Sequence, residues 1–137
     1  MKVLSIYQQT KAIALFLAIF LSGTFSQAQM PSLTIRQKTE NVIKAFERED
    51  FEAITVYFDA TMKSRLPVDG LKMTWIQINT AYGKFEKAEI DNLKESRVDK
   101  YDVIEVPFFF AKEKLNFRLV FNSDREISGL FFTPVQP

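Results

Sequence analysis

The feature that most constrains this fold is a change of hydrophobic period at Gly83. Before it, apolar residues recur at the three- and four-residue spacing of a helix, most regularly in the stripe formed by Leu71, Trp75, Ile78 and Tyr82. After it, apolar and polar residues alternate, as a strand with one buried face requires. Helices followed by strands are typical of an α+β domain with an antiparallel sheet, rather than of alternating βαβ units.

Three helices are expected before the first strand. Thr34 and Gln37 have the spacing of a capping box, which predicts a first helix over 35–48. Asp50 is a suitable N-cap for a second, short helix, and Asp59 can cap a further turn that continues it. The third helix begins near Val68 and carries the apolar stripe, and Gly83 predicts a left-handed C-cap at its end.

Four strands are expected to follow. The charged segment 85–98 predicts a long edge strand or a strand with a bulge, and 101–111, apolar on both faces, predicts a central strand. Pro107 interrupts that central strand and predicts a bulge or an unpaired amide there. Segments 115–121 and 127–133 predict two further antiparallel strands.

The N-terminal segment has the pattern of a cleavable signal peptide. Residues 1–28 contain two lysines and no acid, then the apolar run 12–21, then a short polar stretch. Small residues at Ser26 and Ala28 predict cleavage between Ala28 and Gln29. An uncleaved membrane anchor or a buried helix are the alternatives, although the apolar core is shorter than the roughly 20 residues that a span needs.

Composition narrows the possible chemistry. Of 137 residues, 109 remain after residue 28, which is enough for a single domain over 29–137. The signal contains two of the 18 basic residues and none of the 17 acidic ones, so the remaining charge is −1, and no nucleic-acid partner is expected. Without Cys or His, the chain can form no disulfide, no catalytic triad and no ordinary zinc site. Its few glycines are isolated, so no phosphate loop is expected, and the sequence suggests no cofactor or metal.

The order of residues along the chain resembles a known family, the bacterial domain of unknown function 3887. The resemblance covers Ile43 to Pro134 and rests on Phe58-Asp59-Ala60-Thr61-Met62, Leu66-Pro67, Gly83-Lys84-Phe85, Phe121-Asn122 and Ile127-Ser128-Gly129-Leu130-Phe131-Phe132-Thr133-Pro134. It implies a nuclear-transport-factor-2-like (SnoaL-like) superfamily fold, a cone in which helices pack into a curved four-stranded antiparallel sheet. Such domains often precede an α/β-hydrolase, but these residues contain no Gly-x-Ser-x-Gly elbow.

Several candidate sites follow from this reading. Relatives of that fold include enzymes with a carboxylate in an apolar cavity, where burial raises its pKa, and Asp59 and Glu105 are the candidates here. Aromatic side chains could instead line a pocket for a small apolar ligand. The pocket candidates are Tyr57, Trp75, Tyr82, Tyr101, Phe109, Phe117 and Phe131. Asp91, Glu95, Asp99 and Asp102 could form a calcium site with oxygen ligands. The simpler interpretation is that they are solvent-exposed charged residues.

The functional expectation is a binding domain rather than an enzyme. Apolar residues on both faces of the central strand predict a second docking surface, for a homodimer or a partner domain, on the face that helices leave uncovered. We therefore expect an exported, non-catalytic binding or interaction domain, periplasmic or extracellular in a bacterium. It would contact a membrane only through an uncleaved signal. The alternative is a small-molecule isomerase, cyclase or dehydratase that uses a pocket carboxylate.

Overall fold

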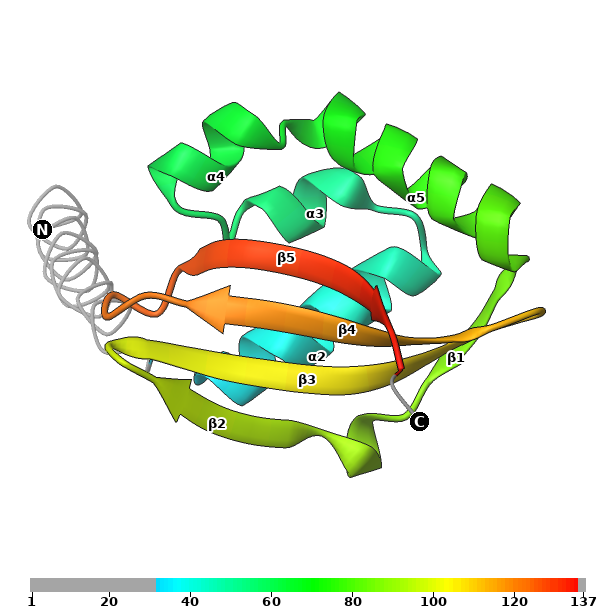
Figure 1. The fold of residues 1–137 in the computed structure, drawn as a ribbon. Coiled ribbons are helices and arrows are strands. Elements are labelled where there is room, and N and C mark those ends of the chain that lie inside the picture. The colour runs from blue at the N-terminus through cyan, green and yellow to red at the C-terminus, as the bar shows by residue number, and fades with distance from the viewer. Residues whose placement is uncertain (1–31, 136–137) are drawn as a thin grey trace, which may run out of the picture. The chain divides into compact units, whose positions relative to one another are not determined.

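Helices precede strands in the structure, as the change of period predicts. The computed structural model describes residues 32–135 (Figure 1). Its helices are α2 (Ile35–Glu47), α3 (Phe51–Thr55), α4 (Ala60–Arg65) and α5 (Val68–Tyr82). Its strands are β1 (Phe85–Ala88), β2 (Lys94–Val98), β3 (Tyr101–Phe110), β4 (Lys114–Phe121) and β5 (Ile127–Pro134), with a 3-10 turn, η2 (Ile90–Asn92), between β1 and β2.

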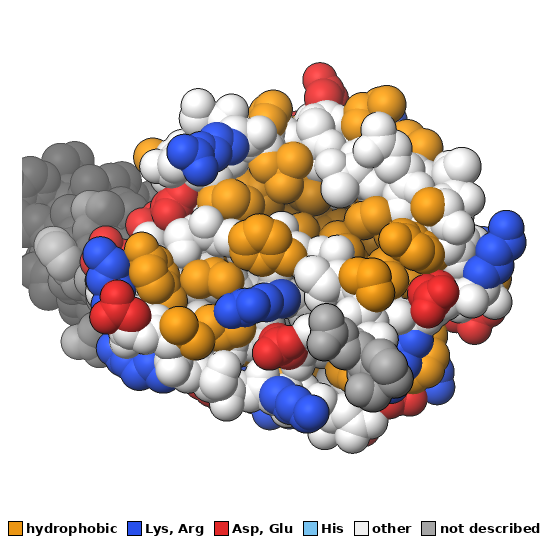
Figure 2. Space-filling view, in the orientation of Figure 1, with side chains coloured by type: hydrophobic (Ala, Val, Ile, Leu, Met, Phe, Trp, Pro, Cys, Tyr) orange, Lys and Arg blue, Asp and Glu red, His pale blue; other side chains and the backbone are white. Residues whose placement is uncertain are grey.

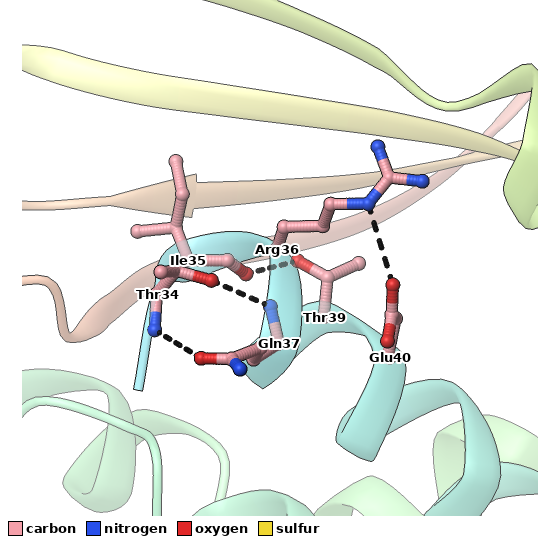
Figure 3. Close-up of polar contacts among 6 residues, drawn as sticks. All are labelled: Thr34, Ile35, Arg36, Gln37, Thr39 and Glu40. Atoms are coloured by element: carbon pink, nitrogen blue, oxygen red, sulfur yellow. Dashed lines mark hydrogen bonds and ion pairs between the residues drawn. The ribbon is translucent and has the colours of Figure 1, made fainter. Parts of the chain in front are cut away.

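Local hydrogen bonds begin the helices where the sequence predicts. At the start of α2, the Gln37 amide donates to Thr34 Oγ1 at 3.1 Å, and the Thr34 amide donates to Gln37 Oε1 at 2.9 Å (Figure 3). Asp50 caps α3 and Asp59 caps α4 through their side chains. The prediction of three helices was wrong for residues 32–135, because the Asp59 cap begins a separate helix, which makes four.

Gly83 ends α5, but in a different conformation from the one predicted. Its φ is +87° and its ψ is 173°, which is outside the left-handed helical region. A Cβ on Gly83 would lie 2.8 Å from Ala111 Cβ, because the β3–β4 turn passes directly against this residue. Glycine is therefore required here both by the positive φ and by the close approach.

The sheet is antiparallel and open, with β3 at its centre. Its order is β1-β3-β4-β5, and β2 pairs with β3 beyond the end of β1. Within residues 32–135 there are five strands rather than the predicted four, because 85–98 divides at η2.

Pro107 explains this division. The Pro107 carbonyl accepts from the Glu89 amide at 2.9 Å, so Pro107 presents its missing N–H to the same edge of β3. A partner strand loses a hydrogen bond at that point, and the chain turns away through η2 before it pairs with β3 again as β2.

The core lies between the helices and one face of the sheet. In Figure 1, α2 passes behind β3 and β4. Strand residues on that face are almost completely buried, among them Ile104, Val106, Phe108, Leu115, Phe117 and Leu119. We call this the inner face, and the opposite side of the sheet the outer face.

A parallel bridge joins the start of β5 to the helical half of the chain. The Ile127 amide donates to the Tyr57 carbonyl at 2.8 Å, and the Asp59 amide donates to the Ile127 carbonyl at 2.9 Å. The first residue of β5 is thereby fixed on both sides, by β4 and by the segment that links α3 to α4.

Candidate functional site

Aromatic side chains fill the inner face. The ring of Phe46 on α2 lies 4.6 Å from Trp75 and 5.6 Å from Phe117 between centroids, and Phe108 lies 4.4 Å from Phe117. Two of the pocket candidates belong to this cluster, since Trp75 is 3% exposed and Phe117 is fully buried. Their contacts are those of a packed core.

The other pocket candidates lie in two separate places. On the helical side, Tyr57 and Tyr82 pack against the edge of the core, and the Tyr57 hydroxyl accepts from Asn41 Nδ2 at 3.0 Å. Tyr101 and Phe109 alternate with the buried residues of β3 and so lie on the outer face, and Phe131 lies there too because it pairs with Arg118, which pairs with Glu105. The structure therefore distributes the seven aromatic candidates over both sides of the sheet.

The two candidate carboxylates have different environments. Asp59 Oδ1 accepts from the Met62 amide at 2.8 Å, and its Oδ2 accepts from Asn122 Nδ2 at 3.4 Å, so both oxygens serve as structural acceptors. Glu105 lies on the outer face, where it accepts a hydrogen bond from Asn116 Nδ2 on β4. The four acidic residues considered for calcium form no metal-binding group within residues 32–135.

A groove of about 660 Å³ surrounds Glu105 on the outer face. Charged side chains from β2, β3 and β4 meet apolar ones from β3, from the end of β5 and from the residue that follows it. The lining includes Lys94, Glu105, Lys114 and Arg118, with Pro107, Pro134 and Val135. Asn92, at its rim, donates to Glu89 Oε2 at 2.6 Å, and this bond lowers the pKa of Glu89.

Arg118 lies in this groove and has unused hydrogen-bonding capacity. It lies directly opposite Glu105 in the β3–β4 register, and its Nε is buried without a hydrogen-bond partner among the described residues. Glu105 is bound by Asn116 instead. A buried guanidinium nitrogen that lacks a partner is costly, so a hydrogen-bond acceptor within reach of Arg118 Nε would stabilise the protein.

An apolar patch adjoins the groove. We define the outer patch as Val98, Tyr101, Val120 and Phe131, which come from β2, β3, β4 and β5. Val98 is 53% exposed and Phe131 is 50% exposed. Figure 2 shows apolar side chains gathered on this face of the sheet, with basic and acidic side chains between them.

Two basic side chains flank Phe109, at the end of the outer face opposite the outer patch. Lys87 Nζ lies 4.9 Å from the centroid of the ring and Lys114 Nζ lies 5.2 Å from it. An aromatic face attracts such cations, so Phe109 holds two positive charges at this end of the outer face.

Sequence reasoning identified Glu105 and the outer-face aromatic residues but not Arg118, Lys94 or Lys114. A signal was present, because Arg118 is a charged residue near the middle of a strand whose alternate residues are apolar, but only the strand register places it beside Glu105. Register between two strands depends on the whole sheet and is weakly encoded in either strand alone.

None of the helices within residues 32–135 combines the length and apolar character needed to span a membrane. No curated protein and no solved structure matches the chain. Residues 39–130 match a family described as "Protein of unknown function (DUF3887)", and they include α3, α4, α5, the outer patch except Phe131, and most of the groove. The chain therefore belongs to the DUF3887 family.

Proposed function

We propose that this chain is an exported, non-catalytic binding domain that engages its partner through the outer face of its sheet. The observation that carries the proposal is the outer patch, in which a half-exposed Phe131 lies beside a groove with an unpartnered Arg118 Nε. Exposed apolar side chains that adjoin orienting polar groups are typical of interaction surfaces.

The geometry favours binding over acid–base catalysis. A carboxylate that acts as a general base needs a free oxygen within reach of an enclosed substrate. Asp59 uses both oxygens to hold α4 and Asn122, and Glu105 lies in an open groove beside Asn116. The inner face offers no room for a substrate between Phe46, Trp75 and Phe117.

Two further parts of the proposal concern fold and location. The order of four helices and an open antiparallel sheet supports a nuclear-transport-factor-2-like, cone-shaped fold, as the family resemblance implies. The charge and hydropathy pattern of residues 1–28, which lie outside the described residues, supports export to a bacterial periplasm or exterior and a mature domain over 29–137.

Site-specific photo-crosslinking in the cells that make the protein tests the binding face. A photoreactive phenylalanine analogue replaces Phe131 in one variant and Met73 in the control. Met73 is 54% exposed but lies on α5, away from the sheet. We expect a discrete higher-mass adduct from position 131 and none from position 73. Adducts at position 73 alone, or at neither position, would contradict the proposal.

A further inference from the structure

We propose that the groove on the outer face binds a small organic anion, a carboxylate with an apolar body, and that the guanidinium of Arg118 holds the carboxylate. This inference goes beyond the proposed function, because it concerns the groove rather than the outer patch and names a ligand by its chemistry. It follows from the way in which the strand register arranges long and short side chains across the sheet.

The floor of the groove is a row of short side chains that crosses the strands. Pro107 on β3 pairs with Asn116 on β4, and Asn116 pairs with Thr133 on β5. Paired residues share one face of a sheet, so these three side chains point outward together. The next outward-pointing rows lie two residues away in each direction, at about 7 Å along the strands. They contain longer side chains, which form the walls.

Both walls carry basic groups. On one side Lys94 pairs with Glu105, and Glu105 pairs with Arg118, so these three side chains stand next to one another on β2, β3 and β4. On the other side stands Lys114, four residues from Arg118 along β4. All four side chains line the groove, so its basic groups surround one space.

The division of 85–98 limits the length of the groove. Strand β1 pairs with β3 as far as Phe108 and β2 pairs with it from Glu105 onward, so no residue of either strand pairs with Pro107. Asn92 of η2 lines that end instead. The floor therefore crosses three strands, a distance of about 10 Å. With a volume of about 660 Å³, the groove has the size of a small-molecule site.

Charge favours an anion in this space. Three basic side chains and one acidic side chain line the groove, which gives it a net charge of +2, whereas residues 29–137 together have a net charge of −1. Within residues 32–135, none of the three ion pairs includes Lys94, Lys114 or Arg118. Glu89, beside the rim, pairs with Lys87 at 3.4 Å. The groove therefore concentrates positive charge that its surroundings leave uncompensated.

The guanidinium of Arg118 is the group best suited to hold the anion. It is half-buried, and its Nε has no hydrogen-bond partner among the described residues. Glu105 lies directly opposite but accepts from Asn116 instead. The fork of donors on a guanidinium matches the two oxygens of a carboxylate, and the pair is strengthened where water is partly excluded. A bound carboxylate supplies the acceptor that Arg118 lacks.

Apolar side chains in the same groove receive the rest of the ligand. Pro107 lies on the floor, and Pro134 and Val135 line the end near β5. Val135 is 44% exposed, so it has apolar surface that a ligand can cover. A carboxylate with a short hydrocarbon chain therefore fits the groove better than an inorganic anion does.

An NMR titration of the purified protein at pH 7 tests this site with hexanoate as the probe. A proton–nitrogen correlation spectrum of the arginine side chains reports directly on Arg118 Nε, whose signal is the one that Arg118→Gln removes. We expect hexanoate to shift that signal saturably. Hexanamide, which is neutral, and acetate, which lacks the apolar body, should each bind roughly tenfold more weakly or worse.

Two substitutions should change the hexanoate dissociation constant in opposite directions, as measured from the backbone amide signals of Asn116 and Thr133. Arg118→Gln should weaken binding roughly tenfold or more, because it removes the guanidinium. Glu105→Gln should tighten binding about threefold, because it removes the one negative charge that repels the ligand. The matched control is Arg65→Gln, the same change at an exposed position on α4, which should leave the constant unchanged.

Far-ultraviolet circular dichroism checks that each variant folds. If Arg118→Gln does not fold, Glu105→Gln and the three probes still test the site. The inference is overturned if hexanoate causes no saturable shift, if hexanamide binds as tightly, or if Glu105→Gln weakens binding.

The photo-crosslink at position 131 reports on the proposed function separately. A protein adduct at that position without hexanoate binding overturns the ligand but leaves the outer patch as a binding surface. Hexanoate binding without an adduct supports the groove site and contradicts the partner proposed for the patch. Absence of both overturns both.

Discussion

Asn122 connects the β4–β5 turn to the first turn of α4. Its Oδ1 accepts from the amides of Asp124 at 2.9 Å and Glu126 at 3.0 Å, while its Nδ2 reaches Asp59 Oδ2 at 3.4 Å. One side chain thus satisfies two turn amides and touches a helix cap that lies far away in sequence.

Replacing Asn122 with Ala should lower the free energy of unfolding by about 1–3 kcal/mol, because it leaves turn amides and a capping carboxylate without their partner. Urea unfolding followed by circular dichroism measures the change. Asn92→Ala is the control, since Asn92 is exposed and bonds only Glu89 locally, and its effect should be below about 0.5 kcal/mol. Equal effects from the two variants would show that the hydrogen bonds of Asn122 contribute no more to stability than the local bond of Asn92.

At the residue scale, contacts between near neighbours could be predicted from the sequence and distant ones could not. Thr34, Asp50 and Asp59 were predicted as helix caps because a cap requires only a side chain and an amide two or three residues on. The contact between Asp59 and Asn122 depends on the parallel bridge at Ile127, which no local pattern encodes.

At the scale of elements, the boundaries of α2, α5, β3, β4 and β5 follow the predicted ones closely. The errors occur where two effects compete. The charged segment 85–98 reads as one strand on its own, yet the missing amide of Pro107 on the next strand divides it. The short helix α4 was merged with its neighbour because Ala60–Arg65 is too brief for periodicity to define.

The junction between α5 and β1 gives a test at this scale. Gly83→Ala should destabilise the protein by about 1–3 kcal/mol, because alanine is strained at a φ of +87° and its Cβ would collide with Ala111. Gly70→Ala is the matched control. Gly70 lies within α5, its added Cβ would be 3.4 Å from the nearest atom, and alanine favours the helix by up to about 1 kcal/mol.

Thermal or urea unfolding of both variants measures the difference. The two substitutions add the same methyl group at opposite ends of one helix, so a difference in sign isolates the effect of backbone conformation and close approach. A Gly83→Ala variant as stable as the wild type would mean that the β3–β4 turn can shift to accept the methyl group.

At the scale of the whole molecule, the two faces of the sheet have different roles within the described residues. The inner face supplies the aromatic core, which composition alone made plausible because 11 of the 14 Phe residues follow residue 28. The outer face contains the candidate site, of which Glu105, Tyr101 and Phe131 could be named from the sequence. Their arrangement with Arg118 and Lys94 could not, because strand register is set by the packing of the entire sheet.

The predicted signal peptide is also tested at this scale. When the full chain is expressed in bacteria, the protein recovered outside the cytoplasm should have the intact mass of a chain that begins at Gln29, because signal peptidase reads the small residues at Ser26 and Ala28. Ala28→Arg should block processing, whereas Ser32→Arg, four residues further on, should not. Recovery of the uncleaved chain in the membrane fraction would support an anchor instead.

The parallel bridge between Phe58 and Ile127 has a consequence for the order in which the chain acquires its structure. Ile127 is fully buried and begins the last strand, so the segment that links α3 to α4 cannot make its sheet contacts until β5 has emerged behind it. Such a distant closure carries a large entropic cost and slows folding. We expect the nascent chain to remain unfolded until almost all of it has been synthesised. An unfolded chain is the form that can pass through a narrow transport channel.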